Sequence, residues 1–209
     1  MKITLVCPAS LPATQFGGIM FLGVQIAIEL AKKGHDLTIF TTDLDFANNA
    51  STFNKNLPKK EVIKGFTINR THVWFSYKLF YVNLGMYFQM KKEKHDIIHT
   101  IGVRSFQSLI AAIISKKNKI PLIISDQGGL TTHPDLKKNS MIKKIMYKIQ
   151  NPLIKFIVNQ TTKIIVPNEY ERKIFLEYTT NEKIVIIKNG INLNELSESK
   201  INFKVKYKI

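Results

Sequence analysis

Short apolar runs rich in β-branched residues alternate along this sequence with longer segments of helical periodicity, and this alternation limits the possible folds most strongly. Such an order is typical of βαβ units, in which helices cover a parallel sheet. Several of the runs are continuously apolar, as strands buried on both faces are. The sequence therefore predicts an α/β fold, a parallel sheet flanked by helices on both faces. The expected strands are Lys2–Cys7, Asp36–Thr41, Phe66–Thr71, Asp96–Thr100, Leu122–Ser125, Lys163–Val166 and Lys183–Ile187.

The segment between the first two expected strands has the clearest helical pattern. Its apolar residues recur at helical spacing and share one face: Met20, Val24, Ala27, Ile28 and Ala31. Gly34 follows the last turn, where a glycine commonly ends a helix. Further helices are expected at Tyr77–Glu93, Ser105–Lys117, Ser140–Gln160 and Glu169–Tyr178, and a long loop at Asp43–Lys60.

The chain is strongly basic, with a formal net charge of +16 over 209 residues. Basic surfaces attract phosphates, nucleic acids and anionic lipids. Nearly all of this charge is lysine, whereas arginine, the residue best suited to bidentate phosphate and base contacts, occurs only three times. No basic-aromatic motif accompanies the charge, so we do not expect nucleic-acid binding. A solvated lysine coat and a functional basic face remain alternatives.

Cys7 is the only cysteine, which excludes an internal disulfide and a metal site of several cysteines. Its place at the end of an apolar run is typical of a small buried residue. No segment reaches the ~20 apolar residues that a membrane-spanning helix needs. The first apolar run ends at Cys7-Pro8 and is too short for a signal peptide. We therefore expect a cytoplasmic protein.

The loop after the first expected strand ends in two adjacent glycines, Gly17 and Gly18, directly before the first helix. Glycine lets a ligand approach the backbone closely, and the free N–H groups of a helix N-terminus bind anions such as a diphosphate. The alternative is that the glycine pair only turns the chain into the helix. The glycine fingerprint of nicotinamide-binding proteins and the Gly-Lys-Ser/Thr of phosphate-binding loops are both absent. Those two classes of nucleotide site are not expected.

Two later strands also end in polar groups. His99 lies at the end of a central strand, where open α/β sheets bind ligands, although a lone histidine there is more commonly structural. Asp126 follows the next strand and is a candidate for a base or a sugar-binding group, and equally for a turn cap. We expect both side chains near the loop that holds Gly17 and Gly18.

Asn189-Gly190, after the last expected strand, is by itself only a turn signal. Taken in order, however, these segments resemble the retaining glycosyltransferases of family 4, which have the GT-B fold. The matching positions are Gly17-Gly18 and Gly34-His35 around the first helix, Asp96 and His99 on a central strand, and Ile186–Asn192 at the last strand. The resemblance covers essentially the whole chain.

The resemblance implies the N-terminal half of a GT-B fold, a Rossmann-like domain that binds mainly the acceptor. Residues 1–191 would form this domain, and residues 192–209 would be the linker and the truncated start of a missing C-terminal donor domain. Gly17 and Gly18 would face the diphosphate of a nucleotide-sugar, and Asn189-Gly190 would form the interdomain hinge. Transfer to a glycan or a lipid-linked acceptor would need the C-terminal half, on this chain or a separate one. No metal would be required, since backbone N–H groups and fixed cations can stabilise the leaving phosphate.

On the same resemblance, His99 and Asp126 are the catalytic candidates. The acceptor and sugar side is assigned to Gln127, Gly128, Gly129 and His133. Two positions depart from the family pattern: Ile101 replaces its second central histidine, which often contacts the sugar, and Gln127 stands where many relatives have histidine.

Two other classes stay open, a stand-alone noncatalytic Rossmann-like binding module and a nicotinamide-dependent oxidoreductase without the usual fingerprint. A basic amphipathic helix over Lys137–Gln160 also has two interpretations. It would lie on the anionic inner face of a membrane, as a peripheral contact, or cover the sheet with a lysine-rich outer face. We favour the second.

Overall fold

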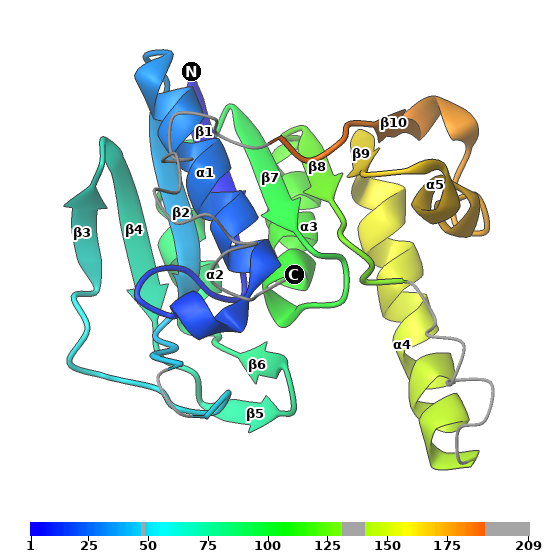
Figure 1. Cartoon of the computed structure of the whole chain (residues 1–209), viewed down its shortest axis with the longest axis horizontal. Helices are drawn as coiled ribbons and strands as arrows, with labels where there is room; N and C mark the ends of the chain where they lie inside the picture. The colour runs from blue at the N-terminus through cyan, green and yellow to red at the C-terminus, as the bar shows by residue number, and fades with distance from the viewer. Residues whose placement is uncertain (47–48, 131–140, 191–209) are drawn as a thin grey trace, which may run out of the picture.

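The computed structural model describes residues 1–46, 49–130 and 141–190, and its centre is an eight-stranded sheet (Figure 1). The strand order is β10-β9-β8-β7-β1-β2-β4-β3, and all neighbours pair in parallel except the antiparallel β3 and β4. The expected parallel sheet is confirmed. Its strands are β1 (Lys2–Val6), β2 (Asp36–Thr42), β3 (Lys60–Ile63), β4 (Phe66–Thr71), β7 (Ile97–Ile101), β8 (Leu122–Ser125), β9 (Lys163–Val166) and β10 (Ile184–Ile186).

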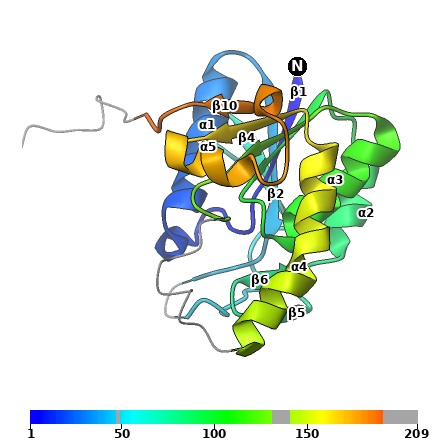
Figure 2. The same ribbon diagram turned by 90° about the vertical axis from the view of Figure 1, so that its right-hand side faces the viewer.

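Helices cover both faces of this sheet (Figure 2), as expected. One face carries α1 (Gly18–Lys32), and the other carries α2 (Gly85–Lys91), α3 (Phe106–Asn118) and α4 (Met141–Gln160). The described residues also form α5 (Glu169–Phe175) after β9 and two short 3-10 turns, η1 (Thr14–Phe16) before α1 and η3 (Asn181–Lys183) before β10.

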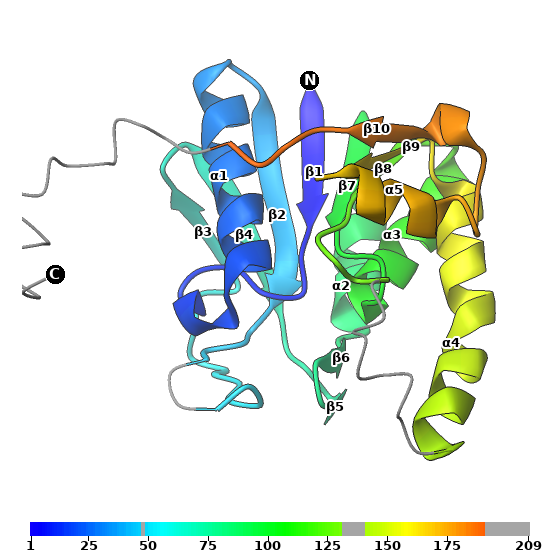
Figure 3. The same ribbon diagram turned by 45° about the vertical axis from the view of Figure 1, so that its right-hand side comes forward.

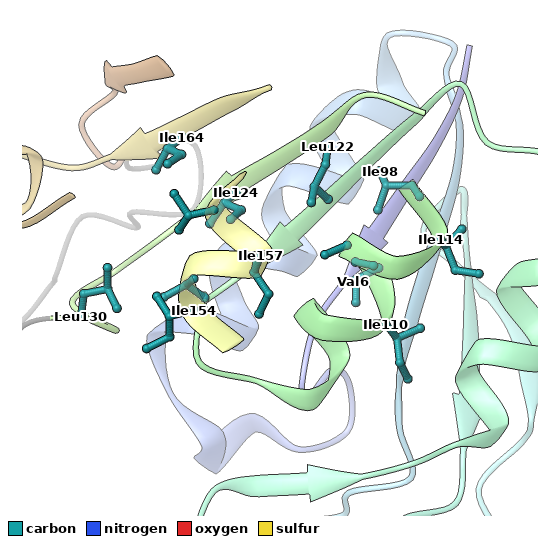
Figure 4. Packing of buried hydrophobic residues seen from close by; sticks show 14 of the residues in the cluster. Val6, Ile98, Ile110, Ile114, Leu122, Ile124, Leu130, Ile154, Ile157 and Ile164 are labelled. Carbon is teal, nitrogen blue, oxygen red and sulfur yellow. The ribbon is translucent and has the colours of Figure 1, made fainter. Parts of the chain in front are cut away.

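Strand β1 contributes to two hydrophobic cores, because successive side chains of a strand point to opposite faces. Ile3 and Leu5 pack into the core under α1, whereas Val6 packs into the larger core with α3 and α4 (Figure 4). His99 of β7 lies opposite Leu5 in the sheet register, so its side chain is directed to the α1 face. The sheet thus places this histidine under α1.

Helix α4 packs against the sheet along residues 150–160, the part of the helix whose side chains are described. Ile154, Ile157 and Val158 are at most 3% exposed and belong to the larger core, and Figure 4 shows Ile154 and Ile157 among the other side chains of this cluster. For residues 150–160 the structure therefore supports the sheet-covering interpretation. The first turns of α4 extend past the end of the sheet (Figure 1).

The expected helix end at Gly34 is confirmed. Gly34 has φ +81°, a left-handed conformation that favours glycine, and its N–H donates to the carbonyl of Ala31 at 2.9 Å. The N–H of His35 reaches back to Leu30 at 3.2 Å. These two bonds form the paired arrangement that commonly closes a helix before the chain turns into a strand.

The expected helix over Tyr77–Glu93 is wrong in its first half. Residues 75–82 form a hairpin of β5 (Phe75–Tyr77) and β6 (Phe80–Val82), and only α2 is helical. Aromatic residues favour strands, and Lys78 between them has φ +53°, which a helix does not allow. Tyr81 is fully buried and its hydroxyl donates to the carbonyl of Ala50, so contacts outside the segment decide its conformation.

The sequence does not predict β3, because its four residues carry no regular apolar pattern. In the structure these residues are partly or largely exposed. It pairs with β4 at the outer edge of the sheet, where the backbone partner supplies the order that the side chains do not. Two expectations lie outside the described residues: His133 on the acceptor side, and the linker and domain start at 192–209.

Candidate functional site

The three loops that the sequence groups together do lie at one edge of the sheet. Strands β8, β7 and β1 are consecutive neighbours and parallel, so the segments after them leave from the same side. Two bonds join the second and third loops: Gly102 N–H donates to the carbonyl of Ser125 at 2.8 Å, and Val103 N–H donates to the Asp126 carboxylate at 3.0 Å. This edge is where parallel α/β sheets bind ligands.

Gly17 and Gly18 stand at the N-terminus of α1 and differ in why they are glycine. Gly17 has φ +97°, so its conformation alone favours glycine. A Cβ on Gly18 would meet no atom of the described residues within 4 Å, and its φ lies outside the left-handed range. Neither backbone strain nor packing against those residues therefore requires glycine at 18. In the same part of the chain no side chain caps the helix, which leaves its first N–H groups directed at the rim of the sheet.

His99 is 8% exposed and uncharged at neutral pH. Burial lowers the pKa of its imidazole to about 4. Its Nε2 atom forms a hydrogen bond with the Ser125 hydroxyl, 2.8 Å away. A buried neutral imidazole can share a hydrogen bond with a ligand hydroxyl, but it does not supply positive charge to a leaving phosphate.

His99 and Ser125 line a cavity of about 370 Å³, here named the β7 cavity. Its other walls include side chains of α1, among them Leu22, Ile26 and Glu29, together with Ile165 of β9 and the segment that leaves β10. In Figure 3 this segment runs from β10 across the molecule toward α1. The cavity therefore brings a central strand, the first helix and the end of the last strand together.

Gln127 and Asn189 close one side of the β7 cavity with two reciprocal hydrogen bonds. The Gln127 amide donates to Asn189 at 3.2 Å, and the Asn189 amide donates back at 2.8 Å. The predicted acceptor-side and hinge residues are thus adjacent, together with Gly190, although 62 positions separate the pair in the sequence. A movement of the segment after β10 would have to break this pair.

Asp126 is fully buried and its carboxylate holds two loops together. One oxygen accepts from Val103 N–H, and the other accepts from Gly129 N–H at 2.8 Å. Burial raises the pKa of this carboxyl to about 6; the nearby Glu171 adds to the rise, while the backbone N–H groups, including that of Leu130, oppose it. This geometry favours the turn-cap alternative over direct contact with substrate.

The glycines after Asp126 fit the same turn. Gly128 has φ +82°, and a Cβ on Gly129 would come within 2.5 Å of an Asp126 oxygen. The conformation and packing of the loop therefore explain both glycines, which supports a structural role for them in addition to any contact with a sugar.

Apart from Asp126 and the glycines of its turn, the predicted residues that the structure describes form two groups. Gly17 and Gly18 lie at the open rim, whereas His99, Gln127, Asn189 and Gly190 line the β7 cavity along the flank of α1. The nearest cavity residue on α1 is Leu22, which follows Gly18 by about one helical turn, roughly 6 Å along the axis.

The sequence analysis missed a second cavity of about 620 Å³ at the carboxyl ends of β2 and β4. Asp43 follows β2 and His72 follows β4, and the two side chains are 2.5 Å apart. The signal was available, since polar residues that directly follow parallel strands face the ligand-binding edge. Asp43 was instead assigned to the start of a loop.

An exposed aromatic surface, also missed, lies on the β5–β6 hairpin. Trp74, Phe75, Tyr77 and Leu79 are each more than half exposed, as is Phe88 on the following helix. Large apolar side chains gathered on one solvent-facing element indicate a contact surface rather than chance exposure. In Figure 1 the hairpin and the first turns of α4 project beyond the same end of the sheet.

Among the described residues, no three His, Cys, Asp or Glu side chains gather as a metal-binding group. In the same part of the chain, no helix combines the length and apolar character that crossing a membrane would require.

The family model of Glycosyltransferase Family 4 matches residues 16–195. No curated protein matches the sequence. Among solved structures, HepE of Anabaena in complex with UDP superimposes with a TM-score of 0.59 at 14% identity, over 93% of this chain and 45% of HepE. Sucrose-phosphate synthase of Thermosynechococcus elongatus gives 0.60 at 16% identity, over 92% of this chain and 49% of the synthase.

The chain therefore spans about half the length of these two enzymes. A shorter chain of the same synthase is matched almost completely, over 92% of this chain and 91% of the other, with a TM-score of 0.59 at 14% identity. At such identities the similarity concerns the fold, which is the Rossmann-like domain of a GT-B protein.

Proposed function

Because the chain belongs to glycosyltransferase family 4, we propose that it is the acceptor-side half of an enzyme that transfers a sugar from a nucleotide-sugar to a glycan or a lipid-linked acceptor. The transfer requires a C-terminal donor-binding domain, on the same polypeptide or on a separate one. HepE, which shares the fold, is described in complex with UDP, and this supports a nucleotide-sugar donor. The proposal depends chiefly on Gly18, whose lack of a side chain the fold itself does not explain.

In this mechanism the N-terminus of α1 lies against the donor diphosphate. As the glycosidic bond breaks, negative charge grows on the leaving phosphate, and the uncapped N–H groups after Gly17 stabilise it. Fixed dipoles and cations supply this stabilisation, so we expect transfer to proceed without a metal ion. His99 forms a hydrogen bond with a sugar hydroxyl, as acceptor or as donor, and its neutral state allows either role.

The test substitutes Gly18 in the enzyme completed by its C-terminal half. Gly18→Asp introduces a negative charge where the diphosphate would bind, and Gly18→Asn is the uncharged control of the same shape. We expect Asp to lower kcat/KM for the nucleotide-sugar at least about tenfold more than Asn, since like charges at short range repel. Because an acidic residue in the first turn favours the helix, the unfolding free energy should not fall.

Equal activity of the two Gly18 variants would contradict a diphosphate site at this helix. The competing function, a noncatalytic binding module that works alone, predicts a different pattern. In that case the chain would bind its ligand fully without a C-terminal half, and adding that half would produce no sugar transfer.

We also propose that the chain works at the cytoplasmic face of a membrane, with the aromatic hairpin as its contact. Trp and Tyr prefer the boundary between lipid and water, and the net charge of +16 favours anionic lipid. Flotation with anionic vesicles tests this idea. Phe75→Ser together with Phe88→Ser should reduce the bound fraction severalfold. Tyr170→Ser with Leu176→Ser, an exposed pair in α5 and at its C-cap, should not. Equal loss in both variants would rule out the hairpin as the contact.

A further inference from the structure

The second cavity, here named the basic pocket, lies on the same sheet edge as Gly17 and Gly18. Strand β2 is the neighbour of β1, and the pocket opens where β2 and β4 end. The described residues that line it include Asp43, Lys55, Lys59, Arg70, His72 and Trp74. At about 620 Å³ it has the size of a site for a small molecule.

Arg70 connects the pocket to the glycine loop. It is 3% exposed, and its guanidinium forms an ion pair with Glu61 and donates to the carbonyls of Pro58 at 3.0 Å and Leu11 at 2.6 Å. Leu11 belongs to the loop that ends at Gly17 and Gly18. The wall of the pocket is therefore fixed to the proposed donor site.

The free charge of the pocket is positive. Lys55 and Lys59 are exposed, and neither forms an ion pair with a residue that the structure describes. The one carboxylate of the lining, Asp43, is 4% exposed and already bound to His72 and to the N–H of Val73. Two unpaired ammonium groups at the mouth of a concave site favour an anionic ligand.

The pocket also offers the groups that bind sugars. The bond between its Nδ1 atom and the Asp43 carboxylate fixes the His72 imidazole and leaves the Nε2 atom available to a ligand hydroxyl. Trp74 is 71% exposed and presents a flat apolar surface on which a sugar ring can pack. A cation pair, a fixed imidazole and an exposed indole together match a ligand that is both charged and rich in hydroxyls.

We propose that the basic pocket binds an anionic saccharide, a sugar that carries a phosphate or a carboxylate group, and that this saccharide is the acceptor of the transfer. Lys55 and Lys59 bind the anionic group, His72 binds a hydroxyl, and Trp74 packs on the ring. The binding of the saccharide stands on the pocket alone, whereas its role as acceptor rests on the proposed function.

Trp74 makes the test direct, because it is the only tryptophan in the chain. Its fluorescence is titrated with glucose 6-phosphate and with glucuronate, which distinguish a phosphate from a carboxylate, and with glucose and inorganic phosphate as partial probes. We expect a saturable change with at least one anionic sugar, at a concentration about tenfold or more below that for either partial probe.

A matched pair of double variants tests the lysines. Lys55→Gln with Lys59→Gln should weaken binding of the anionic sugar at least about tenfold, since each lysine makes a charge-assisted contact. The control, Lys33→Gln with Lys117→Gln, removes the same charge from exposed positions at the end of α1 and in α3. These positions lie next to the amino ends of β2 and β8, so this variant should change the binding of the anionic sugar less than about twofold. His72→Gln should weaken the binding of the anionic sugar and leave the binding of inorganic phosphate unchanged.

Three results would overturn the proposal: no saturable change with either anionic sugar, equal weakening in the two double variants, or inorganic phosphate binding as tightly as the sugar. The titration contains no donor, so its failure leaves the Gly18 experiment intact. Binding without any transfer by the completed enzyme would instead remove the acceptor role and the proposed function, and keep the pocket as a saccharide site.

Discussion

Gly17 and Gly18 are chemically identical neighbours, yet the fold requires only the first. A φ of +97° accounts for Gly17, whereas no described atom lies within 4 Å of a Cβ at Gly18, and we assign this glycine to the proposed diphosphate site. Asp126 shows the opposite case, because backbone N–H groups of two loops occupy its oxygens and explain the residue without a substrate. The reason for a residue's identity therefore differs from position to position, and the atoms around each residue show which reason applies.

His99 should make the stability of the chain depend on pH. Its folded pKa of about 4 lies below the ordinary value of 6.5, so between these values the unfolded state binds a proton that the folded state does not. Stability contributed by the neutral imidazole is complete above pH 6.5 and is lost as pH falls toward 4. The loss approaches about 3 kcal/mol.

The measurement is the unfolding free energy in urea against pH for the wild type and His99→Gln. The comparison is needed because Asp126, whose pKa is raised from 3.8 to about 6, titrates in the opposite sense over much of this window. The wild type should lose stability relative to the variant as pH falls. His35→Gln, which removes a histidine from the turn after α1, is the control and should keep the wild-type dependence. A pH-independent difference for His99→Gln would contradict the burial of its imidazole.

Asp126→Ala should lower the unfolding free energy by roughly 3 kcal/mol, because it leaves several buried N–H groups without an acceptor. Asp45→Ala, on a half-buried aspartate in another loop, is the control and should lower it by less. Urea unfolding measures both. A loss of transfer activity in Asp126→Ala with unchanged stability would support the catalytic assignment instead.

At the scale of elements, the β5–β6 hairpin decides what surrounds the basic pocket. The sequence predicts a helix there, but the hairpin buries Tyr81 and exposes Trp74 at the pocket. Helix α1, in contrast, follows from local signals alone, from its apolar face to the glycine that ends it.

Lys78→Gly distinguishes the hairpin from the helix by the sign of its effect. At φ +53° a glycine relieves strain, so we expect the unfolding free energy to rise by about 0.5–1 kcal/mol. In a helix the same substitution would lower it by about 1 kcal/mol. Lys91→Gly in α2 is the control and should be destabilising. Thermal unfolding of both variants is sufficient.

For the whole molecule, the proposed function divides the binding of the donor between two domains. The glycine rim would contribute one helix N-terminus, and the C-terminal donor domain would contribute the remaining contacts. We expect the chain by itself to bind UDP at least about a hundredfold more weakly than the enzyme completed by its C-terminal half, measured by calorimetry. Equally tight binding by the chain alone would contradict this division.

The sequence by itself determined the parallel sheet, the first helix and the glycine rim, because these depend on periodicity and turn chemistry within a few neighbouring residues. Seven apolar runs became strands, and Gly34 ended α1 where a helix end was expected. The shared edge of β1, β7 and β8 followed as well, since parallel strands joined by helices all end on one side.

Only the tertiary structure decided which polar side chains meet. His72 and Asp43 are 29 positions apart, and Gln127 and Asn189 are 62 apart, so no local pattern encodes either pair. Burial likewise fixed the neutral state of His99 and the turn-capping geometry of Asp126. Such properties depend on which elements pack against a group and exclude water from it, and packing partners are set by the whole fold rather than by neighbouring residues.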